Sequence, residues 1–374
     1  MEGLGVYIHI PFCIKKCNYC DFCSFAGQGD AMFEAYTDEL CRRMRVFSKK
    51  YGKRNADTVY FGGGTPTLLP LACFDRLMTT LKECFEIETD AEITVECNPA
   101  SIDEQGLRQL RALGTNRISI GLQSANEKEL ELLGRPHSFV DFCVAFESAR
   151  RVGFDNISLD IMYGIPEQTL ESFEQTLNEA CALSPEHISA YGLKIEEGTA
   201  FARNRETLIL PDEDIEYQMY CLCNEILSRH GYNRYEISNF AKVGRESRHN
   251  LKYWLLEDYI GFGVAAHSCF SGERFGNSRD IKAFLAGEDI VEERTLISSD
   301  EQATEYVMLG LRLDRGIDLL DYERRFGRAF ENDFREIDAF LKGGFMTKDN
   351  GRIAFTTKGF FVSNTILAQM LSFD

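Results

Sequence analysis

The sequence predicts an α/β protein in which an incomplete barrel of six β–α units precedes a small helical domain with a hairpin. Three observations support this fold class. β-Branched runs alternate with helical patterns up to residue 191, the alternation stops near Ile195, and the last part combines helical patterns with one hairpin pattern. Strands that are regularly separated by helices are typical of parallel sheets. Six such units suit a partial (β/α)6 barrel better than an open doubly wound sheet.

The predicted strands are short runs rich in β-branched and aromatic residues. They cover Val6–Ile10, Thr58–Phe61, Glu92–Val95, Arg117–Ile120, Asn156–Ile161 and His187–Tyr191. Between them, apolar residues recur at three- and four-residue spacing, which indicates helices that pack against a sheet. These helical patterns cover Phe33–Phe47, Cys73–Phe85, Phe139–Val152 and Leu170–Leu183.

The second half of the chain has a different organisation. Pro211 before an acidic turn predicts a helix over Ile215–His230, and an aromatic, glycine-rich region follows over 232–275. A hairpin is predicted around Asn350-Gly351, after helical patterns over Gln302–Leu311, Leu319–Phe326 and Phe330–Leu341. We therefore divide the chain into a barrel (1–195), a barrel extension (196–297) and a C-terminal winged-helix-like domain (298–374).

The composition excludes several classes of function. The 374 residues include 41 Lys and Arg against 59 Asp and Glu, a formal net charge of −18. This balance argues against a general nucleic-acid binder and against a polybasic membrane anchor. No apolar run approaches the roughly 20 residues that span a bilayer, and the first residues do not resemble a signal peptide. Thirteen cysteines, an odd number at low density, predict a reducing cytoplasm and a metal or redox role for any special ones.

Three cysteines directly follow the first predicted strand: Cys13, Cys17 and Cys20. A loop after a barrel strand lies at the C-terminal mouth, where barrel enzymes keep their chemistry. The three thiolates indicate one soft-metal centre, and an iron–sulfur cluster is favoured over zinc or incidental cysteines because no second ligand pair is present. Cys23 offers a fourth ligand. With three ligands, a cubane cluster has one iron open to a chelating molecule.

Glycine and polar residues stand at the ends of the next predicted strands. Gly62–Gly64 follow the second strand, and glycine lets a backbone approach a ligand closely. Glu96, Gln123 and Asp160 lie at the ends of the third, fourth and fifth strands. Each alone is typical of a cap or a solvated strand end, but together they indicate a shared site beside the cysteines. Arg135 either binds a carboxylate there or lies on the surface before a proline turn.

The cysteine spacing resembles the radical S-adenosylmethionine (SAM) superfamily, whose signature is C-x-x-x-C-x-x-C on the first loop of a partial TIM-like barrel. Two segments, Tyr-Ile-His-Ile-Pro-Phe-Cys at 7–13 and Phe-Gly-Gly-Gly-Thr-Pro-Thr at 61–67, resemble the branch that contains oxygen-independent coproporphyrinogen III dehydrogenase. Two others, Cys-Asp-Phe at 20–22 and His-Asn-Leu-Lys-Tyr-Trp at 249–254, resemble the heme-chaperone branch of that family. The resemblance covers essentially the whole chain.

The resemblance implies sites for two cofactors. A 4Fe–4S cluster would be held by Cys13, Cys17 and Cys20. The methionine end of S-adenosylmethionine would be held by Glu96 and by the backbone of Gly63, Gly64 and Thr65. Five further residues match positions that line cofactor sites in the dehydrogenase: Tyr7, Tyr19, Gln123, Arg135 and Asp160.

One departure from the dehydrogenase favours the chaperone branch. The dehydrogenase has a further cysteine two residues after the third cluster cysteine, where this chain has Phe22, with Cys23 next to it. We interpret Cys23 as a spare thiol. The resemblance then implies a cytoplasmic protein that binds heme and transfers it to acceptor hemoproteins, those of the respiratory chain among the candidates. A peripheral membrane contact is left open, as is enzymatic activity; the rival function is oxidative decarboxylation of coproporphyrinogen III propionates to protoporphyrinogen IX.

His249 is the predicted heme ligand. It lies in an aromatic segment with Tyr253 and Trp254, and heme needs an apolar slot with an axial ligand such as histidine. The alternative is a hydrogen-bonded packing histidine, which is the commoner role of a histidine among aromatic residues. Only the resemblance raises His249 above this alternative.

Overall fold

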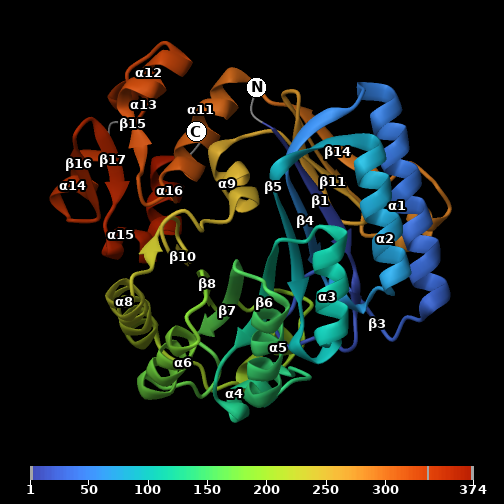
Figure 1. The fold of residues 1–374 in the computed structure, drawn as a ribbon. Coiled ribbons are helices and arrows are strands. Elements are labelled where there is room, and N and C mark those ends of the chain that lie inside the picture. The colour runs from blue at the N-terminus through green and yellow to red at the C-terminus, as the bar shows by residue number, and fades with distance from the viewer. Residues whose placement is uncertain (1–2, 335–336, 372–374) are drawn as a thin grey trace.

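The computed structural model describes residues 3–334 and 337–371, and Figure 1 shows their fold. Its centre is a twelve-stranded sheet with the order β14-β13-β12-β11-β1-β4-β5-β6-β7-β8-β10-β9. The six predicted strands are confirmed and lie side by side in parallel. They are β1 (Leu4–Ile10), β4 (Arg54–Gly63), β5 (Phe85–Cys97), β6 (Arg117–Gln123), β7 (Ile157–Tyr163) and β8 (His187–Gly192).

The barrel extension adds strands at both edges of this sheet. On one edge, β11 (Tyr259–Phe262) pairs in parallel with β1, and the antiparallel strands β12 (His267–Phe270), β13 (Glu273–Asn277) and β14 (Val291–Leu296) follow. On the other edge, β10 (Asn239–Ala241) and β9 (Asn233–Arg234) continue from β8. Within residues 3–334 and 337–371 no ladder joins β14 to β9, so the barrel is incomplete. The predicted boundaries at 195 and 297 stay predictions.

Helices surround the outside of the sheet (Figure 1): α1 (Asp30–Tyr51), α2 (Leu71–Cys84), α3 (Glu104–Leu113), α4 (Glu127–Leu133), α5 (Phe139–Val152), α6 (Leu170–Ala182) and α8 (Glu213–Arg229). Several begin at capping side chains, such as Ser138 before α5 and Thr169 before α6, each of which completes a capping box. Short elements fill the connections: β2 (Phe12–Cys13), β3 (Phe25–Ala26), α7 (Ala200–Arg203), α10 (Ile281–Leu285) and three 3-10 turns, Pro66–Leu68, Pro99–Ser101 and Arg205–Thr207.

The two faces of the barrel strands have different chemistry. Apolar side chains such as Val59, Val95 and Ile118 are buried in the cores under the outer helices. Because successive side chains of a strand point to opposite faces, the residues between them point into the barrel. One interior row of neighbouring register positions consists of Tyr7, Tyr60, Thr94 and Arg117. The barrel interior is therefore polar.

A short helix, α9 (Arg248–Leu255), closes the barrel at the N-terminal end of the strands. Glu92 of β5 accepts hydrogen bonds from the backbone N–H groups of Arg248 and His249. Lys252 of α9 is buried and forms ion pairs with Asp57 and Glu257, both at 2.9 Å. The sequence analysis predicted an aromatic region here but no helix.

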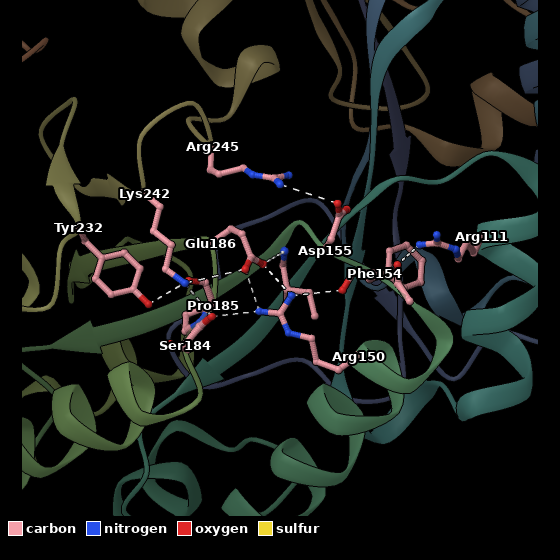
Figure 2. A network of polar contacts seen from close by, with 12 residues as sticks. Arg111, Arg150, Phe154, Asp155, Ser184, Pro185, Glu186, Tyr232, Lys242 and Arg245 are labelled. Atoms are coloured by element: carbon pink, nitrogen blue, oxygen red, sulfur yellow. Dashed lines mark hydrogen bonds and ion pairs between the residues drawn. The ribbon is translucent and has the colours of Figure 1, made fainter.

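A polar network fixes the same end of the barrel from outside (Figure 2). Arg150 of α5 donates two hydrogen bonds, at 2.8 and 3.0 Å, to the carboxylate of Glu186 at the start of β8. Glu186 also accepts from the backbone N–H of Ile157 and lies 3.9 Å from the Lys242 ammonium. Such two-pronged contacts between arginine and a carboxylate are strong and directional, so they hold α5, β7 and β8 together.

The C-terminal domain has its own apolar core. Its helices are α11 (Ser299–Gly310), α12 (Leu319–Phe326), α13 (Phe330–Asp333), α14 (Ile337–Lys342), α15 (Thr357–Phe361) and α16 (Ser363–Met370). The predicted hairpin is confirmed: β16 (Met346–Asp349) and β17 (Arg352–Phe355) join through Asn350 and Gly351, which both have positive φ, and β15 (Ile317–Asp318) pairs with β17. The single helix predicted over Phe330–Leu341 is wrong, because α13 ends at Asp333 and Phe334 leaves the helical conformation.

Candidate functional site

The cysteine loop leaves the barrel at the end of β1. Cys13 ends β2, which pairs with β3, and Cys17 and Cys20 lie on the loop between these two strands. The Cys20 N–H donates to the Cys17 carbonyl, so the loop turns tightly between them. All three thiols are half-buried, whereas Cys23 is 8% exposed and belongs to the apolar core. The three predicted ligands thus share one environment, and Cys23 lies in another.

Two donors from neighbouring loops point at these thiols. The Thr65 hydroxyl lies 3.8 Å from the Cys13 sulfur, and the Arg135 guanidinium lies 3.8 Å from the Cys17 sulfur. Burial raises the pKa of Cys13 and of Cys20, because a low-dielectric environment disfavours the thiolate. A hydrogen-bond donor and a guanidinium oppose that effect, and a bound metal deprotonates a coordinating thiol outright.

The donor set fits an iron–sulfur cluster better than a single ion. In the part of the chain that the structure describes, no three His, Cys, Asp or Glu side chains form a group that could hold one metal ion. A single zinc ion needs its thiolates about 2.3 Å from one point. In a cluster each thiolate binds its own iron, so three thiols on one loop suit it. The sulfur-directed donors Thr65 and Arg135 are consistent with this fit.

The glycine segment Gly62–Gly64, at the end of β4, lies directly against the cysteine loop. The N–H groups of Gly64 and Thr65 donate to the carbonyls of Ile10 and Phe12. A Cβ at Gly64 would lie 2.6 Å from the Phe12 carbonyl oxygen and 3.0 Å from the Cys13 sulfur. Gly63 has φ +115°, which residues with a side chain rarely adopt. The segment therefore requires glycine and brings its backbone next to the thiols.

Glu96 at the end of β5 faces this segment. Its carboxylate accepts from the Gly63 N–H at 3.0 Å and from the Tyr60 hydroxyl at 2.8 Å. Burial raises the pKa of Glu96 to about 7, although both hydrogen bonds oppose the rise. The same carboxylate can therefore be neutral or charged near neutral pH and is placed to hold a positively charged group beside the glycine backbone.

Gln123, Asp160 and Arg135 line the next part of the mouth. Gln123 has φ +70°, and the register between β6 and β7 shifts beside it, which marks a strained strand end. The Asp160 carboxylate accepts from the Ser119 hydroxyl, and burial raises its pKa. Arg135 donates to the Gly121 carbonyl at 3.0 Å, and its Nε has no partner among the described residues.

The two predicted tyrosines have different surroundings. The Tyr7 hydroxyl lies 2.9 Å from His9 Nδ1, and the other ring nitrogen of His9 contacts the Cys23 carbonyl at 3.0 Å. Burial raises the pKa of Tyr19, and the Arg135 guanidinium beside it partly offsets the rise. Tyr19 therefore lies beside the cysteine loop, whereas Tyr7 lies deeper in the barrel, in the same row as Tyr60.

His249 lies at the opposite, N-terminal end of the barrel. It is 1% exposed, and both ring nitrogens have partners: Thr58 at 2.9 Å and Tyr253 at 2.8 Å. Burial lowers the pKa of His249 to about 3, and the positive charges of Lys252 and Arg117 contribute less to this shift. The imidazole is therefore neutral. In this conformation His249 occupies the packing role that the sequence analysis weighed against heme ligation.

Tyr60 is a site residue that the sequence analysis missed. It stacks on the His249 ring with 5.2 Å between centroids, and its hydroxyl contacts Glu96. Tyr60 thus connects the closed end of the barrel with the mouth. The sequence contains a signal for this residue. Along the strand, Tyr60 and Gly62 alternate with the apolar residues Val59 and Phe61, and this alternation assigns Tyr60 to the inner face.

Comparisons with known proteins identify the family. Residues 7–180 match the model of the radical SAM superfamily, and residues 297–362 match the HemN C-terminal domain. Heme chaperone HemW of Bacillus subtilis is 35% identical over 98% of this chain and 99% of its own length. Heme chaperone HemW of Escherichia coli is 32% identical over 100% of this chain and 99% of its own. The chain belongs to the HemW family.

A solved structure supports the fold of this HemW family member over almost its whole length. Coproporphyrinogen III oxidase HemN of Escherichia coli, a radical SAM enzyme, superposes with a TM-score of 0.86 at 27% identity, covering 98% of this chain and 89% of that one. The predicted partial radical SAM barrel with its C-terminal domain is therefore confirmed. Membership of the radical SAM superfamily implies S-adenosylmethionine and a 4Fe–4S cluster. Among the described helices, none is both long and apolar enough to cross a bilayer.

Proposed function

We propose that this protein is a cytoplasmic heme chaperone, which binds heme and transfers it to acceptor hemoproteins. The observation that carries the proposal is the end-to-end similarity to proteins named heme chaperone HemW. The loop chemistry supports it: Phe22 occupies the position where the dehydrogenase has a further cysteine, and its side chain is 67% exposed. Cys23 cannot replace that cysteine without leaving the core. Respiratory hemoproteins are candidate acceptors, and a peripheral membrane contact is compatible with such partners.

Cys13, Cys17 and Cys20 hold the 4Fe–4S cluster in this proposal. The backbone of Gly63, Gly64 and Thr65, with the Glu96 carboxylate, holds the methionine end of S-adenosylmethionine. Further contacts to the cofactor come from Tyr7, Tyr19, Gln123, Arg135 and Asp160. When bound, a reduced cluster can supply one electron to the sulfonium of the cofactor. The protein's own part is to fix the cofactor against the loop and to exclude water from it.

Heme ligation by His249 requires a local rearrangement. The imidazole is neutral, as a metal ligand must be, but Thr58 and Tyr253 occupy both nitrogens. Release of Tyr253, which lies on the same short helix α9, would free Nε2 and expose the aromatic residues around it. We therefore propose that the Tyr253 side chain turns away from His249 when heme binds.

The chaperone proposal is tested with hemin and matched histidine variants. We expect a stoichiometric complex with a Soret band that His249→Ala abolishes. His187→Ala is the control, because His187 is also a buried barrel histidine with both nitrogens partnered, by Ser158 and Tyr235. An unchanged spectrum in His249→Ala would show that His249 is not the ligand.

The similarity to HemN favours one rival, the oxidative decarboxylation of coproporphyrinogen III. The discriminating experiment incubates the anaerobically reconstituted protein with S-adenosylmethionine, a reductant and coproporphyrinogen III. The chaperone proposal predicts no protoporphyrinogen, while HemN in a parallel reaction controls for the reagents. Formation of protoporphyrinogen would overturn a chaperone-only function.

A further inference from the structure

The barrel interior contains a cation without a direct partner. Arg117 of β6 is 2% exposed. Its Nε is buried and has no hydrogen-bond partner within residues 3–334 and 337–371. Arginine cannot lose its proton in a protein, and burying an unpaired charge is very costly. The fold therefore maintains a positive charge inside the barrel that its own side chains leave unpaired.

A second unpaired donor lies beside this cation. Thr94 of β5 occupies the register position opposite Arg117, is fully buried, and its hydroxyl has no partner among the described residues. The flanking residues Ile93, Val95 and Ile118 pack into the outer cores, so Thr94 and Arg117 both face the interior. A guanidinium with an unpartnered Nε and an unpartnered hydroxyl, at neighbouring register positions, are the donor half of an anion site.

The barrel's own carboxyl groups are engaged elsewhere. Glu96 accepts its hydrogen bonds from a tyrosine and a backbone N–H, and Asp160 accepts from a serine. The charge of Arg117 lowers the pKa of both carboxyls, against the larger effect of burial, but neither lies within ion-pair distance of it. His187 and His249 are kept neutral by burial and by the same cation. The interior therefore supplies no direct anion for Arg117.

We propose that Arg117 and Thr94 form a binding site for one carboxylate group inside the barrel. A guanidinium binds a carboxylate through two parallel hydrogen bonds, and the Thr94 hydroxyl supplies a third donor. One negative charge matches one guanidinium, whereas a doubly charged phosphate would be repelled by Glu96 and Asp160. The carboxylate is either a small free carboxylate or the carboxylate arm of a larger ligand bound in the barrel.

Direct binding of radiolabelled propionate tests the site without reference to heme. Equilibrium dialysis of the anaerobically prepared, cluster-containing protein, at constant ionic strength set with chloride, should show saturable binding. Arg117→Met should raise the Kd about tenfold or more, because hydrogen bonds to charged groups are the strong ones. Thr94→Val, which keeps the shape of the side chain, should raise it by a smaller factor. Arg248→Met, which removes a positive charge from the outer end of α9, should bind as the wild type does.

Two competition experiments identify the source of the carboxylate. If saturating propionate weakens binding of hemin or of S-adenosylmethionine, the site takes the carboxylate arm of that ligand; if it weakens neither, the site takes a free carboxylate. Both outcomes support the site. The proposed site would be overturned if propionate shows no saturable binding. It would also be overturned if the wild type, Arg117→Met and Thr94→Val all bind propionate with the same Kd. Should circular dichroism show that Arg117→Met is unfolded, Thr94→Val alone decides.

Discussion

Four cysteines close together in the sequence have two different environments. Cys13, Cys17 and Cys20 are half-buried on the loop, and the sulfur atoms of Cys13 and Cys17 have donors from Thr65 and Arg135. Cys23 packs into the apolar core, and its carbonyl is held by His9. At the scale of single residues, the candidate metal ligands thus differ from the structural thiol in their position: Cys13, Cys17 and Cys20 lie on the loop at the mouth, and Cys23 lies in the core.

Cys17→Ala should lose the iron–sulfur cluster, and Cys23→Ala should keep it. The first substitution removes a thiolate that would bind its own iron, while the second removes only a buried sulfur from the core. Iron and sulfide content, with the visible charge-transfer absorption of the anaerobic protein, measure the difference. Loss of the cluster in Cys23→Ala would revive a four-thiolate centre.

Glu96→Gln should remove a pH dependence from both cofactor binding and stability. The pKa of Glu96 is raised from 4.5 to about 7, so the native state binds the extra proton between these values and stability falls as the pH rises through that window. The free energy of unfolding of the variant minus that of the wild type should therefore grow from about pH 5 to pH 8. Wild-type affinity for S-adenosylmethionine should fall below about pH 7, where Glu96 becomes neutral.

Glu236→Gln is the matched control, because burial also raises the pKa of Glu236 to about 7 but this carboxyl lies by Ser238 and Asn239, away from the glycine segment. It should change the pH dependence of stability and leave cofactor affinity unchanged. Urea unfolding and equilibrium dialysis measure the two quantities. A cofactor affinity that stays constant on acidification would contradict the role of Glu96.

At the scale of elements, the loops after β1 and β4 act as one unit. Gly64→Ala should disrupt the cluster in a folded chain, because the new Cβ would lie 2.6 Å from the Phe12 carbonyl oxygen and 3.0 Å from the Cys13 sulfur. Gly29→Ala is the control, since nothing lies within 4 Å of a Cβ there. Iron content and circular dichroism should separate the two variants; full iron content in Gly64→Ala would show that the loops move apart freely.

The sequence was sufficient for the six barrel strands, because each is a β-branched run bounded by polar turns. It also predicted that residues at the C-terminal ends of the parallel strands lie at one edge, while their roles in cofactor binding stay predictions. It did not predict α9, whose short helix is held by Glu92 and Lys252 contacts from distant strands. Nor did it predict the interior row of Thr94 and Arg117: alternation with Ile93, Val95 and Ile118 separates the two faces of each strand, but it does not show that the inner donors lack partners.

At the scale of the whole molecule, one side chain joins the barrel extension to the C-terminal domain. Arg234 of β9 donates to Asp314 at 3.1 and 2.8 Å and to Asn224 of α8 at 2.9 Å. Its guanidinium also lies over the Phe360 ring, 4.0 Å from the centroid. The C-terminal domain is therefore attached to the barrel extension through a largely buried charge as well as through apolar contacts.

Arg234→Ala should destabilise the protein and separate the unfolding of the C-terminal domain from that of the barrel. Loss of charge-assisted hydrogen bonds and of a desolvated cation–π contact amounts to on the order of 3 kcal/mol. Calorimetry should show a calorimetric enthalpy that exceeds the van't Hoff enthalpy, the sign of more than one transition. Arg229→Ala removes only an exposed pair with Glu225 on the surface of α8, where a change below about 1 kcal/mol is expected. A single transition of unchanged midpoint in Arg234→Ala would mean that the apolar contacts alone hold the domains together.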